Sequence, residues 1–178
     1  MTKPELETCM IKYGKDIYSF CRSLVGSIQE AEDLYQDTFL KAIELNEKID
    51  AAGNPKSYLL SIAVRIWNNR KRKYAWRKRI ADFKSYTEGQ DVEEEISAAS
   101  TPEEHALRLE EVQTVRRLVA GLPERLRVIV LLYYMEELTV PQIAEILHIP
   151  QGTVKSRMYQ ARKALQKELE VFYEEGYQ

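Results

Sequence analysis

The stretch TVPQIAEILHIPQGTVKSRMYQARKAL, residues Thr139 to Leu165, decides the fold of the second half of the chain. It reads as two short helices that meet at a tight turn. Thr139 and Gln142 have the spacing of a capping box, in which the Thr139 hydroxyl caps an orphan amide, and Pro141 falls in the first helical turn, where a missing N–H costs nothing. His148 stands where the chain must turn, and His adopts the left-handed backbone more readily than most residues. The pattern predicts a helix-turn-helix between Val140 and Tyr159.

The second of these helices has one apolar face and one basic face. The apolar stripe recurs at helical spacing and consists of Val154, Met158, Ala161 and Leu165. The opposite face carries Gly152, Ser156, Tyr159, Gln160 and Lys163, flanked by Lys155, Arg157 and Arg162. No acid occurs between Gln151 and Lys167. An ordinary helical hairpin with a solvated basic face would also show this pattern, but the cap, the turn and the basic face coincide, which favours a DNA reader in the major groove.

Charge is distributed unevenly along the 178 residues, although the formal net charge is only −2. Acids cluster in residues 30–50 and 88–95, and bases cluster in residues 65–79 and 155–167. An apolar fraction of 44% is enough to support a core. Two basic segments in a chain of nearly neutral total charge indicate two separate anion-binding surfaces.

The two cysteines, Cys9 and Cys21, fall on one predicted helix, about 18 Å apart and beyond disulfide reach. No apolar run approaches the roughly 20 residues that span a bilayer. Residues 1–7 are too polar and acidic for a signal peptide. These features lead us to expect a cytoplasmic protein in a reducing setting.

The first two predicted helices suggest a packing element followed by a charged one. Residues 5–25 carry an apolar stripe of Met10, Ile17, Phe20, Cys21 and Leu24, with Tyr13 and Tyr18 expected outside. Ser27 and Glu30 form a second capping signal before residues 31–46, AEDLYQDTFLKAIELN. There Leu34, Thr38 or Phe39, Ile43 and Leu45 are expected to face a core, and Glu32, Asp33, Gln36, Asp37 and Lys41 to lie outside beside an exposed Tyr35. Such a face is either simply solvated or a protein-docking surface.

A third helix is expected to begin near Ser57, after a loop over Lys48 to Lys56. Its buried side is Leu59, Ile62, Ala63 and Ile66, and another side presents Tyr58, Arg65, Asn69, Arg72 and Trp76. Residues 65–79 contain no acid, and Trp67, Tyr74 and Trp76 are interleaved with the bases. A bare basic run is usually a solvated face. Aromatic rings among cations favour single-stranded or melted nucleic acid, because each ring stacks on an unpaired base for about 1–3 kcal/mol.

The remaining segments complete an all-α prediction. Residues 82–100 are acidic with little to bury, which is typical of a flexible linker. A helix should open at Thr101 and Pro102, carry apolar Leu107, Val112, Val115, Leu118 and Val119, and stop at Gly121. Residues 123–135 should be the central support of the second domain, burying Leu126, Ile129, Val130, Tyr133 and Tyr134. We therefore expect two small helical domains, 1–82 and 102–178, joined by a flexible acidic linker at 83–101.

Three motifs together resemble an extracytoplasmic-function (group-four) sigma factor of bacterial RNA polymerase, and the resemblance covers nearly the whole chain. They are Ala31 to Ala42, which resembles the polymerase-binding helix, Tyr58 to Arg72, which resembles the strand-opening helix, and Glu137 to Ala164, which resembles the helix-turn-helix of the second domain. The chain departs from the family pattern at Arg65, His148, Pro150 and Gln160. Because bases are read through such positions, the promoter sequence does not carry over.

The resemblance implies three sets of site residues. Polymerase binding is expected at Asp33, Leu34, Gln36, Asp37 and Phe39. Recognition and melting of the minus-ten element, with an extruded base near Lys48 to Lys56, is expected to involve Asn54, Lys56, Tyr58, Arg65, Asn69, Arg72 and Trp76. Reading of the minus-thirty-five element is expected at Gln151, Thr153, Lys155, Ser156, Arg157, Tyr159, Gln160 and Arg162.

The resemblance also implies partners: core RNA polymerase, promoter DNA and a membrane-tethered anti-sigma protein, with no small-molecule substrate. A conventional helix-turn-helix regulator is the alternative, but it leaves the acidic helix and the aromatic basic helix without a role. An enzyme is disfavoured, because the two histidines, His105 and His148, have no ligand-spaced partners and no phosphate loop or nucleophile motif occurs. No cofactor and no metal are expected.

Overall fold

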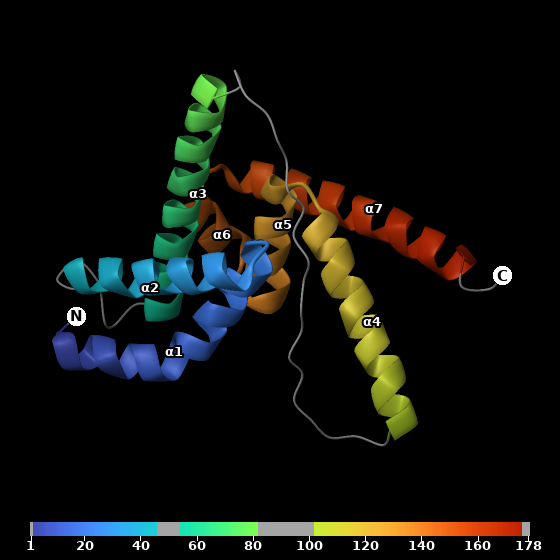
Figure 1. Cartoon of the computed structure of the whole chain (residues 1–178), viewed down its shortest axis with the longest axis horizontal. Helices are drawn as coiled ribbons and strands as arrows, with labels where there is room; N and C mark the ends of the chain where they lie inside the picture. The colour runs from blue at the N-terminus through green and yellow to red at the C-terminus, as the bar shows by residue number, and fades with distance from the viewer. Residues whose placement is uncertain (1, 46–53, 82–101, 176–178) are drawn as a thin grey trace. The chain divides into compact units, whose positions relative to one another are not determined.

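The computed structural model describes residues 2–45, 54–81 and 102–175, and within these ranges it is helical without strands (Figure 1). The chain forms two compact units, which are considered separately below. The first contains helices α1 to α3. The second is built mainly from α4, α5, η2 and α7. The predicted all-α, two-domain fold is confirmed, while the linker predicted at 83–101 lies outside the described residues.

Side-chain caps begin each helix of the first unit, α1 (Lys3–Leu24), α2 (Ile28–Glu44) and α3 (Pro55–Ala81). In α1 the amide of Thr2 donates to Glu5 Oε2 (2.7 Å), a hydrogen bond that lowers the pKa of this carboxyl. Ser27 Oγ accepts from the amide of Glu30 (3.1 Å), as predicted. Asn54 Oδ1 accepts from the amide of Ser57 (3.1 Å), so α3 begins two residues earlier than expected.

The core of the first unit is an apolar seam contributed by all three helices. Its buried members are Leu6, Ile17, Phe20, Cys21 and Leu24 of α1, Ala31, Leu34, Thr38, Phe39 and Ala42 of α2, and Leu59, Leu60, Ile62, Ala63, Val64 and Trp67 of α3. Thr38 satisfies its buried hydroxyl by donating to the Leu34 carbonyl (2.6 Å). The prediction for Ile43 and Leu45 was wrong: Ile43 is exposed and Leu45 half-buried, because the buried stripe of α2 continues to Ala42.

Aromatic side chains join α1 to α2 at the edge of this core. The ring of Tyr35 meets those of Tyr18 (5.6 Å between centroids) and Phe39 (4.9 Å) edge-on. Tyr18 and Tyr35 are therefore half-buried packing residues rather than exposed ones, as is Tyr13 by its burial. Gly14 lies opposite, and a Cβ there would stand 3.0 Å from Tyr35 Oη. The missing side chain makes room for the Tyr35 phenol.

The second unit is built from α4 (Pro102–Gly121), α5 (Glu124–Val130), the π-helical η2 (Leu131–Met135) and α7 (Gln151–Glu175), and α6 (Val140–Leu147) precedes α7 in the chain. One cluster in it consists of Leu122, Leu126, Val130 and Ala161, with Val119, Ala164 and Leu165 packed against them. This places α5 against α7, as the sequence predicts for a central support.

One expectation for this unit was wrong, because Tyr134 is 55% exposed rather than buried. The reason for its exposure is the π turn of η2, in which the amide of Glu136 donates to the Leu131 carbonyl (3.1 Å) and side chains leave the α-helical register. In α4, Val112 and Val115 are about half exposed, at 47% and 50%, whereas Thr114 between them is buried.

No helix in the described parts of the chain combines the length and the apolar character that crossing a membrane requires.

Candidate functional site

The turn between α6 and α7 has the backbone that a helix-turn-helix needs. His148 adopts φ 52°, which confirms the left-handed turn position. Gln142 Oε1 accepts from the Thr139 amide (2.9 Å) and from its hydroxyl (2.8 Å). Only the glutamine half of the predicted capping box is therefore present in the structure. The hydroxyl of Thr139 donates to the Gln142 side chain instead of accepting from a backbone amide. Glu137 also has a positive φ (54°), which no sequence signal indicated.

The exposed face of α7 carries most of the predicted minus-thirty-five residues. Val154, Met158 and Ala161 are buried and Leu165 is half-buried, so the predicted apolar stripe is confirmed. The predicted residues that lie exposed are Gln151, Lys155, Ser156, Tyr159, Gln160 and Arg162, while Thr153 and Arg157 are half-buried. Tyr159 is 69% exposed although it is aromatic. An exposed ring among cations, with no acid before Glu168, is suited to a nucleic-acid groove.

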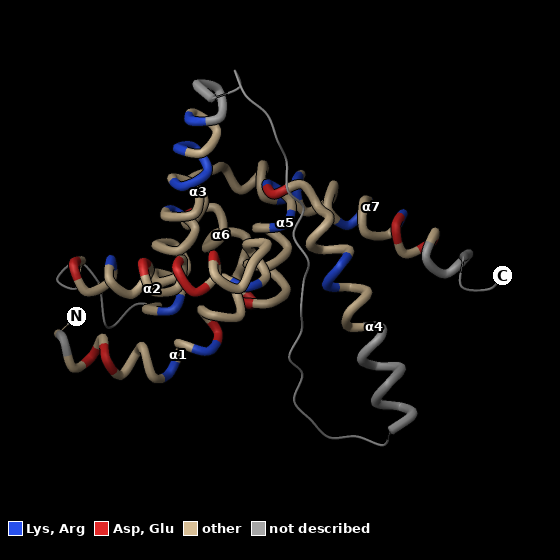
Figure 2. Tube along the Cα trace, viewed as in Figure 1, with Lys and Arg blue, Asp and Glu red and all other residues tan. Residues whose placement is uncertain are grey.

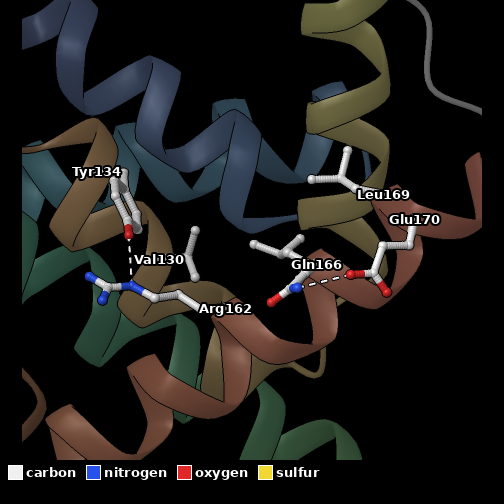
Figure 3. A pocket seen from close by; sticks show the side chains of 7 residues that line it. Val130, Tyr134, Arg162, Gln166, Leu169 and Glu170 are labelled. Atoms are coloured by element: carbon white, nitrogen blue, oxygen red, sulfur yellow. Dashed lines mark hydrogen bonds between the residues drawn. The ribbon is translucent and has the colours of Figure 1, made fainter. Parts of the chain in front are cut away.

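Arg162 contacts two tyrosines within its own unit. Its Nε donates to Tyr134 Oη (2.9 Å), and its guanidinium lies about 6 Å from the rings of Tyr133 and Tyr134. Figure 3 shows Arg162 reaching across to Tyr134 at one end of a groove of about 430 Å³. Val130, Leu165 and Leu169 line the groove, and Gln166 and Glu170 are hydrogen-bonded beside it (2.9 Å). Arg162 therefore ties α7 to η2.

The basic helix α3 presents its predicted face to solvent. Repeated Lys and Arg positions run along it in Figure 2. Of the predicted minus-ten residues, Arg65, Asn69, Arg72 and Trp76 are exposed, Tyr58 is half-buried, and Asn54 serves as the helix cap. Lys56 Nζ pairs with Asp16 Oδ2 of α1 (2.7 Å). The remainder of the predicted Lys48 to Lys56 loop, before Asn54, lies outside the described residues.

The aromatic residues of α3 fall into two groups. Tyr74 and Trp76 are 69% and 66% exposed, an unusual state for large rings that is typical of stacking platforms. Trp67 is buried in the core, with Lys71 Nζ 4.5 Å from its ring centroid, so its predicted place among the stacking residues was wrong. Its burial follows from the apolar stripe of α3 continuing past Val64.

The acidic helix α2 presents Asp33, Gln36 and Asp37 to solvent, as predicted. The structure corrects the prediction for the two apolar residues among the expected polymerase-binding residues. Leu34 and Phe39 are 0% and 4% exposed and hold α2 in the core, so their side chains do not lie on its outer surface. Leu40, 59% exposed and one turn from Gln36 and Asp37, is an apolar residue on that outer surface. Sequence reasoning missed it, although its position off the buried stripe was the available signal.

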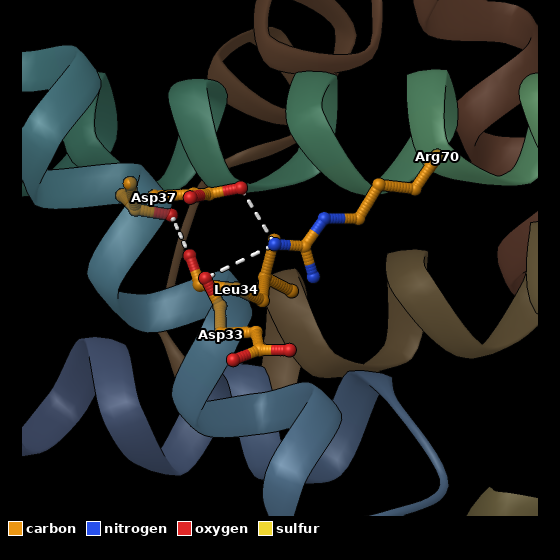
Figure 4. Close-up of polar contacts among 5 residues, drawn as sticks. Asp33, Leu34, Asp37 and Arg70 are labelled. Atoms are coloured by element: carbon orange, nitrogen blue, oxygen red, sulfur yellow. Dashed lines mark hydrogen bonds and ion pairs between the residues drawn. The ribbon is translucent and has the colours of Figure 1, made fainter.

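One ion pair links the acidic helix to the basic one. Arg70 Nη2 donates to Asp37 Oδ2 (2.6 Å) and to the Asp33 carbonyl (3.1 Å), as Figure 4 shows. The side chains of Arg70 and Asp37 are 37% and 50% exposed. Among the described residues, no group of three His, Cys, Asp or Glu is placed to hold a metal ion.

Comparison with known protein families gives two matches. The model described as Sigma-70 region 2 matches residues 10–77, and the one described as Sigma-70, region 4 matches residues 113–165. The first range covers most of α1 to α3. The second covers the later part of α4, α5, η2, α6 and the first part of α7.

Individual relatives resemble the chain over most of its length. The ECF RNA polymerase sigma factor SigW of Bacillus subtilis is 33% identical over 158 residues, which is 88% of this chain and 84% of that protein. The RNA polymerase sigma-H factor of Pseudomonas aeruginosa is 29% identical over 178 residues, 98% of this chain and 91% of that one.

Two solved structures share the fold. The sigma factor RpoE of Bartonella quintana, solved with the anti-sigma factor NepR, gives a TM-score of 0.75 at 22% identity, covering 93% of this chain and 96% of that one. CnrH, solved with the cytosolic domain of CnrY, gives 0.62 at 19% identity, covering 93% and 88%.

Proposed function

The chain belongs to the extracytoplasmic-function (ECF) family of RNA polymerase sigma factors, and on this premise we propose that it binds core RNA polymerase through α2 and promoter DNA through α3 and α7. As a sigma factor it directs promoter recognition and transcription initiation. Its contribution is binding and positioning, without catalytic chemistry of its own.

The observation that carries the assignment of surfaces is the division of charge among three exposed helix faces. Acids are exposed on α2, and bases are exposed on α3 and on the first part of α7. Figure 2 marks the acidic and basic positions along the trace of these helices. DNA repels the first face and attracts the other two. A regulator that never touches polymerase would use α6 and α7 but would leave the other two faces unexplained.

The two basic faces suit different forms of DNA. On α3 the exposed Tyr74 and Trp76 favour an unpaired strand, because rings stack on bases that a duplex keeps paired. We assign this face to the minus-ten element, with Arg65, Asn69 and Arg72 as backbone or base contacts. On α7 polar and basic side chains at the start of a recognition helix favour the duplex minus-thirty-five element. Holding both units on one polymerase turns two weak contacts into one strong contact by effective concentration.

We also propose that an anti-sigma protein, tethered to the membrane, inhibits this chain. Support comes from the fold shared with RpoE and CnrH, whose structures were solved with NepR and with the cytosolic domain of CnrY. Exposed apolar residues on α2, Ile28, Leu40 and Ile43, would be covered in such a complex.

Core binding is the test that separates a sigma factor from a conventional regulator. Purified chain should capture core RNA polymerase, and Asp33→Lys should weaken capture at least about tenfold by opposing the charge of the docking face. Asp33 is preferred to Asp37, because Asp37→Lys would also break the ion pair with Arg70.

Glu7→Lys is the matched control, since it makes the same charge change at an exposed position of α1 in the same unit. It should leave capture unchanged. Failure of the wild-type chain to bind core would refute the proposal, and equal losses from both variants would remove α2 as the docking surface.

A further inference from the structure

We infer that Arg70 is shared between the docking face and the DNA face: Asp37 holds it in the free chain, and polymerase docking on α2 releases it to a phosphate of the unpaired strand. The inference rests on the proposed function. It adds Arg70, which lies on none of the faces assigned above, to the residues that contact DNA, and it makes this contact conditional.

The geometry shows how Arg70 is held. Its Nη2 reaches from α3 across to α2, where it donates to Asp37 Oδ2 and to the Asp33 carbonyl (Figure 4). Asp33 contributes its backbone only, and its carboxylate points away from the guanidinium in the same view. Among the described residues, Asp37 is therefore the one charged group that pairs with Arg70, and Asp37 is one of the acids proposed to meet polymerase.

The ion pair is weak enough to exchange. Both side chains are more than one third exposed, and water screens partly exposed pairs strongly. A cation from a docking partner that takes the Asp37 carboxylate would leave Arg70 with a neutral carbonyl as its acceptor. An arginine in that state is available to a phosphate, which accepts a stronger, charge-assisted hydrogen bond.

The surroundings of Arg70 favour a phosphate. Arg70, Lys73 and Arg77 recur at helical spacing on one side of α3, and Lys73 and Arg77 are exposed. The sequence of α3 contains no acid, so the carboxylate of Asp37 is a negative charge brought to this stripe from another helix. It occupies Arg70 and repels a strand that follows the stripe. Neutralising Asp37 should relieve both effects.

The test measures binding of the full chain to a fluorescent 12-residue oligothymidine at fixed salt, without polymerase. Asp37→Asn, which removes the charge and keeps the shape, should tighten binding about two- to fivefold, the range that a surface ion pair allows. The salt slope should steepen by about 0.7, corresponding to one more phosphate contact on a single strand. Arg70→Gln should leave the free wild-type chain unchanged and should abolish the gain in the Asp37→Asn background.

Two variants provide matched controls. Asp33→Asn removes the same charge one turn away and keeps the carbonyl that Arg70 uses, so any gain from it should be smaller and independent of Arg70. Lys73→Gln should weaken binding both in the wild-type chain and in the Asp37→Asn background. Lys73 lies on the same side of α3 as Arg70, but it is not the residue that Asp37 holds. Thermal melts identify any variant that has lost its fold.

A gain from Asp37→Asn that persists with Arg70→Gln would overturn the inference, because it would reflect net charge alone. The inference would also be overturned if Arg70→Gln weakened oligothymidine binding by the free wild-type chain as much as it does in the Asp37→Asn background. In the holoenzyme, Arg70→Gln should slow promoter opening although it is silent in the free chain, and no effect there would also contradict the inference. Transcription by core enzyme with the wild-type chain is scored separately, so that failure of the proposed function is recognised independently.

Discussion

Lys155 and Tyr159 lie one helical turn apart on the exposed face of α7, yet their side chains favour different contacts. A lysine ammonium is a flexible point charge that holds a phosphate of any sequence. A tyrosine combines a ring with one hydroxyl, and it contacts base edges or thymine methyl groups that differ between sequences. Substituting the two residues one at a time can therefore separate the binding of phosphates from the reading of bases.

We predict that Lys155→Ala weakens duplex binding by a similar factor on every sequence and reduces the salt slope by about 0.9. Tyr159→Ala should instead change the order of preference among minus-thirty-five variants, with the slope unchanged. Binding measured over a salt series on a small library of duplexes checks both. Uniform losses from both variants would show that the face only grips phosphate.

Arg162 shows that exposure alone does not assign a residue to DNA. Its helical position places it at the edge of the basic face, while its Nε donates to Tyr134 of η2. The same guanidinium has other N–H groups for a phosphate, so a loss of DNA binding on substitution would combine two causes. Arg162 is for that reason a poor first choice for mapping the reading face.

At the scale of the helix, α1 and α2 pack through a tight contact between Gly14 and Tyr35. Glycine inside a helix costs roughly 1 kcal/mol relative to alanine. Here the missing Cβ leaves room for Tyr35 Oη, which would otherwise meet it at 3.0 Å. The ring of Tyr35 is held in turn by Tyr18 and Phe39, so it cannot move away freely.

We predict that Gly14→Ala changes the unfolding free energy of the chain little or lowers it, because strain at Tyr35 offsets the gain in helix propensity. In a Tyr35→Phe background, which removes the hydroxyl, the same substitution should stabilise by about 1 kcal/mol. Urea unfolding of the four proteins of this cycle provides the measurement. Equal effects of Gly14→Ala in both backgrounds would mean that the hydroxyl is not the obstacle.

At the scale of the whole molecule, the proposed function depends on two units that are joined in one chain and that each hold DNA weakly. In that proposal the docking face and the minus-ten face lie on α2 and α3 of the first unit, and the minus-thirty-five face lies on α7 of the second. If polymerase holds both units at fixed places, the spacing of the two promoter elements becomes part of recognition.

We predict that inserting 5 base pairs, about half a turn of duplex, between the two elements abolishes transcription by the holoenzyme. The second element would then face away from the unit that reads it. Run-off transcription from both templates measures the effect, and binding of the free chain to a duplex carrying only the minus-thirty-five element should be unchanged. Full activity on the lengthened spacer would contradict fixed placement.

Sequence alone determined where the helices lie, how several of them begin and which faces are basic. These features are local: a cap needs residues three apart, and a stripe needs one helix, so Ser27 with Glu30, the left-handed His148 and the apolar stripe of α7 were all predicted. The family followed from motifs on these same local elements.

Only the tertiary structure decided which of several neighbouring residues meet the core. It buried Trp67 and exposed Ile43, because the packing angle of a helix selects among adjacent apolar stripes. It also made the contacts of Arg70 with Asp37 and of Arg162 with Tyr134, which join residues 33 and 28 positions apart. Such pairs depend on the register of one helix against another, and no pattern within a single helix contains that register.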